Sequence, residues 1–116
     1  LVGPLNDARS CHCSMCRLIF AAQASVCAEV DAEKFSWVKG EDQLTSYVGE
    51  QGYGVQFCRH CGSTLSIIYQ GVIHSLTLGC VDGDPGVAIA QHIFVASKAS
   101  WEVIPETALQ FDKYPE

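Results

Sequence analysis

Five of the seven cysteines lie in two short clusters, and their spacing is the first feature of the sequence that could do chemistry. The stretch "CHCSMCR" contains Cys11, Cys13 and Cys16, and the stretch "FCRHCG" adds Cys58 and Cys61. Thiolates at such spacings can hold a metal ion, form disulfides or act as nucleophiles. The rest of the chain helps to decide among these three kinds of site.

A disulfide framework explains the clusters poorly. The cysteine count is odd and nothing in the sequence resembles a secretion signal, whereas disulfide frameworks use even counts in secreted chains. A thioredoxin-type redox pair begins a helix in a βαβ unit, but Cys58 and Cys61 are followed by "GSTLSIIY", which is typical of a strand. Reversible oxidation of this pair stays an alternative to metal binding.

Metal binding fits both clusters. Two thiolates on a Cys-x-x-Cys turn are a recurrent half-site of structural zinc proteins, and Gly62 lets the backbone turn tightly after Cys61. Cys11, Cys13 and Cys16 offer three ligands, the number that catalytic zinc sites use when they leave a fourth position open. We therefore predict zinc, and iron stays an alternative for a four-thiolate site.

The remaining cysteines and the histidines are interpreted as structural. Cys27 and Cys80 lie in apolar, strand-like segments, and free cysteine is among the most buried residue types, so we predict both in the core. We predict no ligand role for the four histidines, which are His12, His60, His74 and His92.

Length and charge exclude several classes of protein. A chain of 116 residues suits one domain with a modest core, and we predict a single domain over residues 1–116. The formal net charge of −6 repels phosphates, so we predict no nucleic acid partner. No apolar run approaches the roughly 20 residues of a membrane-spanning helix. We accordingly predict no membrane partner and a cytoplasmic location.

Short segments rich in β-branched and aromatic residues, separated by glycine-rich turns, predict a mainly β domain with antiparallel pairing. The expected strands cover residues 25–30, 35–38, 44–48, 55–57, 64–69, 73–78, 92–96 and 102–104. One or two helical turns are expected over residues 14–21, with Ser14 as the N-cap. The cysteine clusters then lie at turns of the β domain.

The motifs "CHCSMCR", "FCRHCGSTL" and "HIFVASKASW", in this order, resemble the glutathione-dependent formaldehyde-activating enzyme (GFA) family, which includes centromere protein V. The resemblance covers nearly the whole chain and implies small antiparallel sheets in a β-tent arrangement with cysteine-rich zinc loops. It implies that Cys11, Cys13 and Cys16 hold a catalytic zinc with an open position. It assigns Cys58 and Cys61 to a second, structural zinc.

The family completes that second zinc with an N-terminal Cys-x-Cys-Gly hairpin, and no cysteine precedes Cys11 in this sequence. The domain is therefore expected to be truncated at its N-terminus relative to the family. Cys58 and Cys61 could take ligands from the first cluster, remain metal-free or oxidised, or be completed by another chain. An uncovered sheet edge would also favour a homo-oligomer.

The resemblance implies a carbon–sulfur lyase, similar to S-hydroxymethylglutathione synthase, that joins glutathione or a related small thiol to formaldehyde. The carboxylates of glutathione need cationic partners, and our candidates are Arg17, Arg59 and Lys98. The alternative from another class is a non-catalytic structural zinc-binding β module, which fold analogy alone does not exclude.

Overall fold

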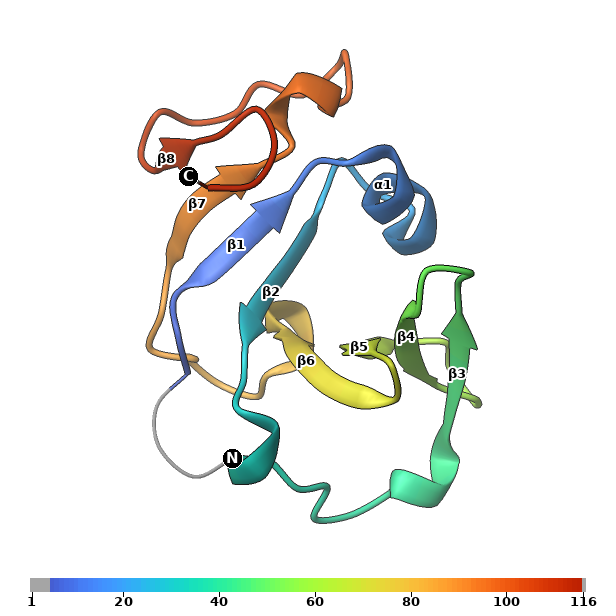
Figure 1. Cartoon of the computed structure of the whole chain (residues 1–116). Coiled ribbons are helices and arrows are strands. Elements are labelled where there is room, and N and C mark those ends of the chain that lie inside the picture. Colours follow the sequence, from blue (N-terminus) through green and yellow to red (C-terminus); the bar gives the residue numbers. More distant parts are fainter. Residues whose placement is uncertain (1–4, 116) are drawn as a thin grey trace.

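The computed structural model describes residues 5–115, and in this part of the chain it contains eight strands and one α-helix (Figure 1). The strands are β1 (Ala8–Cys11), β2 (Ser25–Glu29), β3 (Leu44–Val48), β4 (Tyr53–Cys58), β5 (Thr64–Tyr69), β6 (Val72–Thr77), β7 (Ile89–Ile93) and β8 (Leu109–Gln110). The helix is α1 (Ser14–Phe20), and four 3-10 helices follow it at Ala32–Lys34, Glu41–Gln43, Leu78–Cys80 and Val95–Ser97. Within residues 5–115, no helix is both long enough and apolar enough to span a bilayer.

The strands join edge to edge in one sheet with the order β3-β4-β5-β6-β2-β1-β7-β8. The mainly β fold predicted from the sequence is confirmed. Five of the seven neighbouring pairs are antiparallel, but β7 runs parallel to both β1 and β8. This edge departs from the antiparallel pairing that the sequence predicted. The neighbours of β7 are β1 and β8, and long connections rather than two-residue hairpins separate them along the chain, as parallel pairing requires.

A two-residue turn fixes the register between β5 and β6. Gln70 and Gly71 both have positive φ, at 51° and 80°, as a type I′ hairpin turn requires. Tyr69 is therefore paired with Val72, and the two strands continue as a hairpin on either side of the turn. This turn is one of the glycine-rich turns that the sequence predicted between strands.

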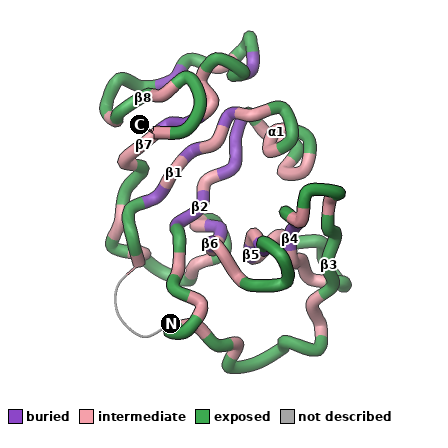
Figure 2. The backbone as a smooth tube through the Cα atoms, in the orientation of Figure 1, coloured by how far each residue is buried: buried purple, intermediate pink, exposed green. Residues whose placement is uncertain are grey.

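The two faces of β1 are covered differently, since successive residues of a strand point to opposite faces of the sheet. Ala8 and Ser10 are buried, and Ala8 is paired with Ala28 of β2, which is also fully buried. Arg9 and Cys11 point to the opposite face and are only partly covered. Figure 2 shows this alternation of buried and intermediate positions along β1.

Several predicted elements differ from the structure. Residues 35–38 and 102–104 form no strand, whereas β1 was not predicted, because "ARSC" lacks the β-branched and aromatic residues typical of strands. The strand predicted at 92–96 ends at Ile93, since Phe94 has a left-handed φ of 55° and starts a 3-10 helix. Such a backbone conformation ends the ladder.

Cys27 is buried, as predicted, but the prediction that Cys80 belongs to the core is wrong. Strand β6 ends at Thr77, and the 3-10 helix that follows turns Cys80 out of the sheet to an exposed position. Its thiol donates a hydrogen bond to the carbonyl oxygen of Thr64 at 3.2 Å.

Candidate metal centre

The three cysteines of the first cluster converge where β1 passes into α1. Cys11 is the last residue of β1, Cys13 is the N-cap of α1, and Cys16 lies in the first turn of the helix. The Sγ of Cys13 accepts a hydrogen bond from the backbone N–H of Cys16 at 3.3 Å. The N-cap is thus Cys13 and not Ser14, the first helical residue, because the thiol takes the usual role of a hydroxyl or carboxylate.

Hydrogen bonding within this triad favours ionisation of one thiol over the other two. Hydrogen bonds from the Cys11 and Cys16 thiols, helped by nearby backbone N–H groups, hold the pKa of Cys13 well below its ordinary value of 9.0. The pKa of Cys11 is raised, because its thiol donates to Cys13 and Cys16 and is partly buried. The triad therefore concentrates thiolate character at Cys13, and thiolate is the form that binds metals.

The geometry and chemistry of the triad fit a soft divalent ion. The sulfur atoms of Cys11, Cys13 and Cys16 all lie within 4.8 Å of one another. Tetrahedral zinc with Zn–S bonds of about 2.3 Å separates its sulfur ligands by about 3.8 Å. Among residues 5–115, this is the single group of three or more possible ligands that lie so close together.

The triad forms one wall of a cavity of about 380 Å³, which is within the range of roughly 300–1,000 Å³ typical of small-molecule sites. The sheet face that carries Cys11 forms the floor of this cavity, while α1 and two aromatic side chains from the C-terminal part close it. The residues from the sheet include Arg9, Cys11, Ser25, Cys27, Glu29, Tyr53, Val55, Ile67, Ser75 and Ile93; those that close it include Met15, Ile19, Phe20, Phe94 and Tyr114.

Strand register explains why these residues share the cavity. Arg9 is paired with Cys27, and Cys11 is paired with Ser25, so alternate residues of β1 and β2 face the same space. Glu29 follows Cys27 by two positions and therefore points the same way. Burial, with a smaller effect of nearby Cys16, raises the pKa of Cys27 to about 12, so Cys27 is a neutral part of the wall.

Comparison with known families adds an independent observation. Residues 3–97 match the family described as glutathione-dependent formaldehyde-activating enzyme. The chain belongs to this family. A comparison with individually curated proteins gives no match. Membership of the GFA family supports a glutathione-dependent, formaldehyde-activating type of function at the level of the family, and the triad lies inside the matched region.

The second cysteine cluster of this GFA chain lies apart from the triad. β4 ends at Cys58, and the turn closes with a hydrogen bond from the Gly62 N–H to the Cys58 carbonyl oxygen at 2.8 Å. Gly62 has a φ of 80°, so the tight glycine turn predicted from the sequence is confirmed. Cys61 is exposed, and hydrogen bonding with Ser63, then with Cys58, lowers the pKa of its thiol.

In the described part of the chain, neither Cys58 nor Cys61 joins a group of three or more close ligands. One four-thiolate site that combines both clusters is therefore not formed in this structure. A metal role for this pair stays a prediction that needs ligands from elsewhere.

None of the three cations predicted to bind glutathione lines the cavity of the triad. Arg17 lies on a different surface of α1 beside Trp101, and the backbone N–H of Arg59 is bonded to the carbonyl oxygen of Gln43. Lys98 donates from Nζ to the carbonyl oxygen of Glu102 at 3.1 Å. Their assignment stays a prediction without support from the shape of the site.

Arg9, which the sequence places beside the first cysteine cluster, lines the cavity, although it was not among the three cations predicted to bind glutathione. The signal that could have found it is the two-residue spacing between Arg9 and Cys11, which places both side chains on one face of a strand. Without a predicted strand over residues 8–11, this spacing alone does not place Arg9 beside Cys11.

Of the four histidines, His74 lines the cavity of the triad and the other three do not. His12 is 1% exposed on the opposite side from the triad sulfurs, where its Nε2 lies 3.1 Å from Nδ1 of His92 and 3.3 Å from the Ser10 hydroxyl. Burial, reinforced by His92, lowers the pKa of His12, so the buried ring is held neutral. His60 is exposed and is hydrogen-bonded to the side chain of Gln43.

Proposed function

We propose that this chain is a zinc-dependent carbon–sulfur lyase-like protein that adds a small thiol such as glutathione to formaldehyde, giving S-hydroxymethylglutathione or a related thiol adduct. In this reaction the thiol sulfur forms a bond to the carbonyl carbon, the π electrons pass to the oxygen, and the thiol proton ends on that oxygen. The observation that carries the proposal is the three-sulfur triad in the wall of a cavity of ligand size.

Cys11, Cys13 and Cys16 are the residues that would hold the zinc ion. Zinc bound by three thiolates would supply an open position that keeps a substrate thiol ionised at neutral pH. Cys13, whose pKa is already lowered by its neighbours, is the first of the three prepared to act as a ligand.

The chain itself supplies confinement. Met15, Ile19 and Phe20 of α1 line the same cavity as the triad, together with Phe94, so the reacting atoms would meet among apolar side chains. Holding two reactants in one such space replaces a bimolecular encounter with an effectively unimolecular one. Confinement matters here because a thiol and formaldehyde also combine without a catalyst.

The test compares the rate of adduct formation, followed by NMR, with zinc-loaded wild type, with Cys13→Ala and without protein. We expect acceleration by the wild type and loss of it in Cys13→Ala, while Cys80→Ala, an exposed cysteine outside the cavity, behaves as the wild type. Equal rates with and without wild-type protein would remove the catalytic proposal. The non-catalytic zinc-binding β module would then be supported if the ion is retained.

The broader assignments belong to the same proposal. A site that depends on free thiolates requires a reducing environment, which supports the cytoplasm as the location. We propose one domain over residues 1–116, with a small thiol as partner. We also propose that the chain forms a homo-oligomer, and a measurement of its molecular mass in solution tests this.

A further inference from the structure

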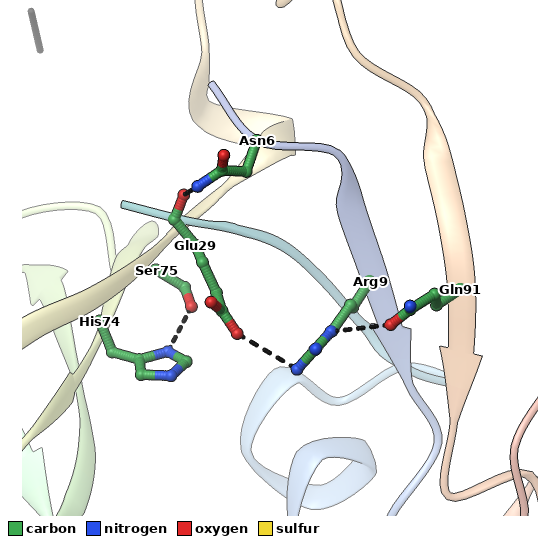
Figure 3. Close-up of polar contacts among 6 residues, drawn as sticks. All are labelled: Asn6, Arg9, Glu29, His74, Ser75 and Gln91. Carbon is green, nitrogen blue, oxygen red and sulfur yellow. Dashed lines mark hydrogen bonds and ion pairs between the residues drawn. The ribbon is translucent and has the colours of Figure 1, made fainter. Parts of the chain in front are cut away.

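An ion pair stands in the same cavity as the triad. Nη1 of Arg9 lies 3.1 Å from Oε1 of Glu29, and Nε of Arg9 donates to Oε1 of Gln91 at 2.9 Å (Figure 3). Both Arg9 and Glu29 line the cavity. They come from adjacent strands, β1 and β2, and Gln91 comes from β7 on the other side of β1.

Both charged groups keep capacity for a ligand. A guanidinium has five N–H donors. Within residues 5–115, its contacts to Glu29 and Gln91 use two of the donors of Arg9, which leaves both donors on Nη2. One carboxylate oxygen of Glu29 contacts Arg9, and the other is available as an acceptor. A bound molecule could therefore contact both groups without breaking the pair.

The exposure of the pair fits binding better than a stabilising role. The side chains of Arg9 and Glu29 are 38% and 48% exposed, so water screens their attraction and the pair adds little to folding. The same exposure makes both charges accessible from the cavity. The side chain of Asn6 donates a hydrogen bond to the backbone carbonyl oxygen of Glu29, and Glu29 is also paired with Ser75 of the neighbouring strand β6. These two contacts fix the backbone of Glu29 that carries the carboxylate.

The position of the pair relative to the triad is set by the strands. Arg9 and Cys11 are two residues apart on β1, so their Cα atoms are separated by about 7 Å on one face of the sheet. On β2, Cys27 separates Glu29 from Ser25, the residue that is paired with Cys11 of the triad. A molecule with its sulfur at the triad can therefore extend along the sheet face to the ion pair.

We propose that Arg9 and Glu29 bind the zwitterionic α-amino acid group of the thiol substrate, with Arg9 taking the carboxylate and Glu29 taking the ammonium group. This inference rests on the proposed function, because it assigns the recognition end of the same cavity. The shared chemistry is an α-amino acid group with both charges, which is present in the γ-glutamyl end of glutathione and in free cysteine.

The neighbouring charges give selectivity as well as attraction. Glu29 repels a simple carboxylate that approaches Arg9, and Arg9 repels a simple amine that approaches Glu29. A zwitterion satisfies both groups, with charge-assisted hydrogen bonds at each end. The pair thus selects thiols that carry a complete amino acid group over thiols that carry one charge.

The experiment measures binding of S-methylglutathione to the zinc-loaded protein by calorimetry. The S-methyl group removes the thiol, so affinity reports on the rest of the molecule. We expect Arg9→Gln and Glu29→Gln each to weaken binding about tenfold or more. Lys39→Gln, which removes an exposed cation outside the cavity, is the matched control and should bind as the wild type.

Ligand variants identify the contact at each residue. N-acetyl-S-methylglutathione lacks the ammonium charge, so it should bind the wild type about tenfold more weakly and be insensitive to Glu29→Gln. S-methylcysteine distinguishes the two sources. Tighter binding of S-methylglutathione assigns the pair to the γ-glutamyl end, and tighter binding of S-methylcysteine assigns it to a cysteine-like substrate.

Two outcomes would overturn the assignment: wild-type protein that binds neither S-methylated ligand, or Arg9→Gln and Glu29→Gln proteins that bind both as tightly as the wild type. A charge reversal, Arg9→Glu with Glu29→Arg, keeps the pair and controls for folding. Normal ligand binding without acceleration of adduct formation would remove the proposed function and leave this subsite. If Arg9→Gln and Glu29→Gln still accelerate adduct formation with the KM of the wild type, the proposed function stands and this subsite is removed.

Discussion

Substitution of Gly54 by alanine should loosen the edge of the sheet without disturbing the triad. Gly54 lies in β4 opposite Val48 of the edge strand β3, and it also lines the cavity. A Cβ atom there would clash with the carbonyl oxygen of Tyr47, and it would lie 2.9 Å from the Cα of Val48 and 3.1 Å from the carbonyl carbon of Tyr47. All of these neighbours are backbone atoms, so no side chain can rotate away and β3 itself must move.

The expected cost is that of overpacking a tight contact, about 1–3 kcal/mol. Because β3 is bonded to β4 alone at the end of the sheet, we expect it to shift outward while the other strands keep their pairing. At about 4 °C per kcal/mol for a domain of this size, the Tm should fall by about 4–12 °C. Thermal unfolding followed by circular dichroism measures this shift, and amide exchange should locate the lost protection in β3.

The matched control is Gly79→Ala, since a Cβ at Gly79 meets no atom within 4 Å and its φ is not positive. This variant should keep the wild-type Tm. The triad lies on β1 and α1, several strands away from β3, so Gly54→Ala should retain the metal content of the wild type. An unchanged Tm in Gly54→Ala, or an equal loss in Gly79→Ala, would refute the steric reasoning.

Three further predictions concern the thiols and the buried histidines. Cys13→Ala should reduce bound zinc from about one ion per chain to nearly none, whereas Cys80→Ala keeps it; metal analysis of the purified variants decides this. In metal-free protein at neutral pH, iodoacetamide should modify Cys13 well before Cys27, because burial raises the pKa of Cys27 to about 12; peptide mass spectrometry measures the order. Burial also holds the pKa of His92 below its ordinary value of 6.5, so the unfolded chain binds that proton more tightly. Its contribution to stability is present above about pH 6.5 and is lost as the pH falls below it, so the Tm should drop between about pH 7.5 and 5.5, and less steeply in His92→Gln.

The parts of the fold that follow local rules could be predicted from the sequence. β3 and β5 begin and end where the sequence predicted, because their residues favour strands and glycine-rich turns flank them. The edge formed by β7 and β8 could not be predicted. Its parallel pairing joins residues such as Arg9 and Gln91 that are far apart in the sequence, and no local pattern encodes their contact.

The sequence predicted the cysteine triad of the candidate site but not the cation that shares its cavity. The spacing of Cys11, Cys13 and Cys16 predicted that three thiols would converge, and their sulfur atoms do lie together. The spacing did not predict which cation would face them. Arg9 and Arg17 both lie beside the cysteine cluster in the sequence, and Arg17 was the one predicted to bind glutathione. However, α1 turns the side chain of Arg17 to another surface, whereas the pleat of β1 directs Arg9 to the cavity.

The weak strand signal of β1 is itself informative about function. A four-residue segment of Ala, Arg, Ser and Cys has little preference for a strand, yet β1 is paired along its length with both β2 and β7. Its conformation therefore comes from its neighbours and not from its own residues. Alternate positions of β1 can therefore carry Arg9 and the candidate metal ligand Cys11 on the cavity face, while Ala8 and Ser10 are buried on the other face. Local preference that conflicts with the adopted structure is expected where residues are retained for chemistry, and in this chain the conflict falls on the strand that joins the triad to the ion pair.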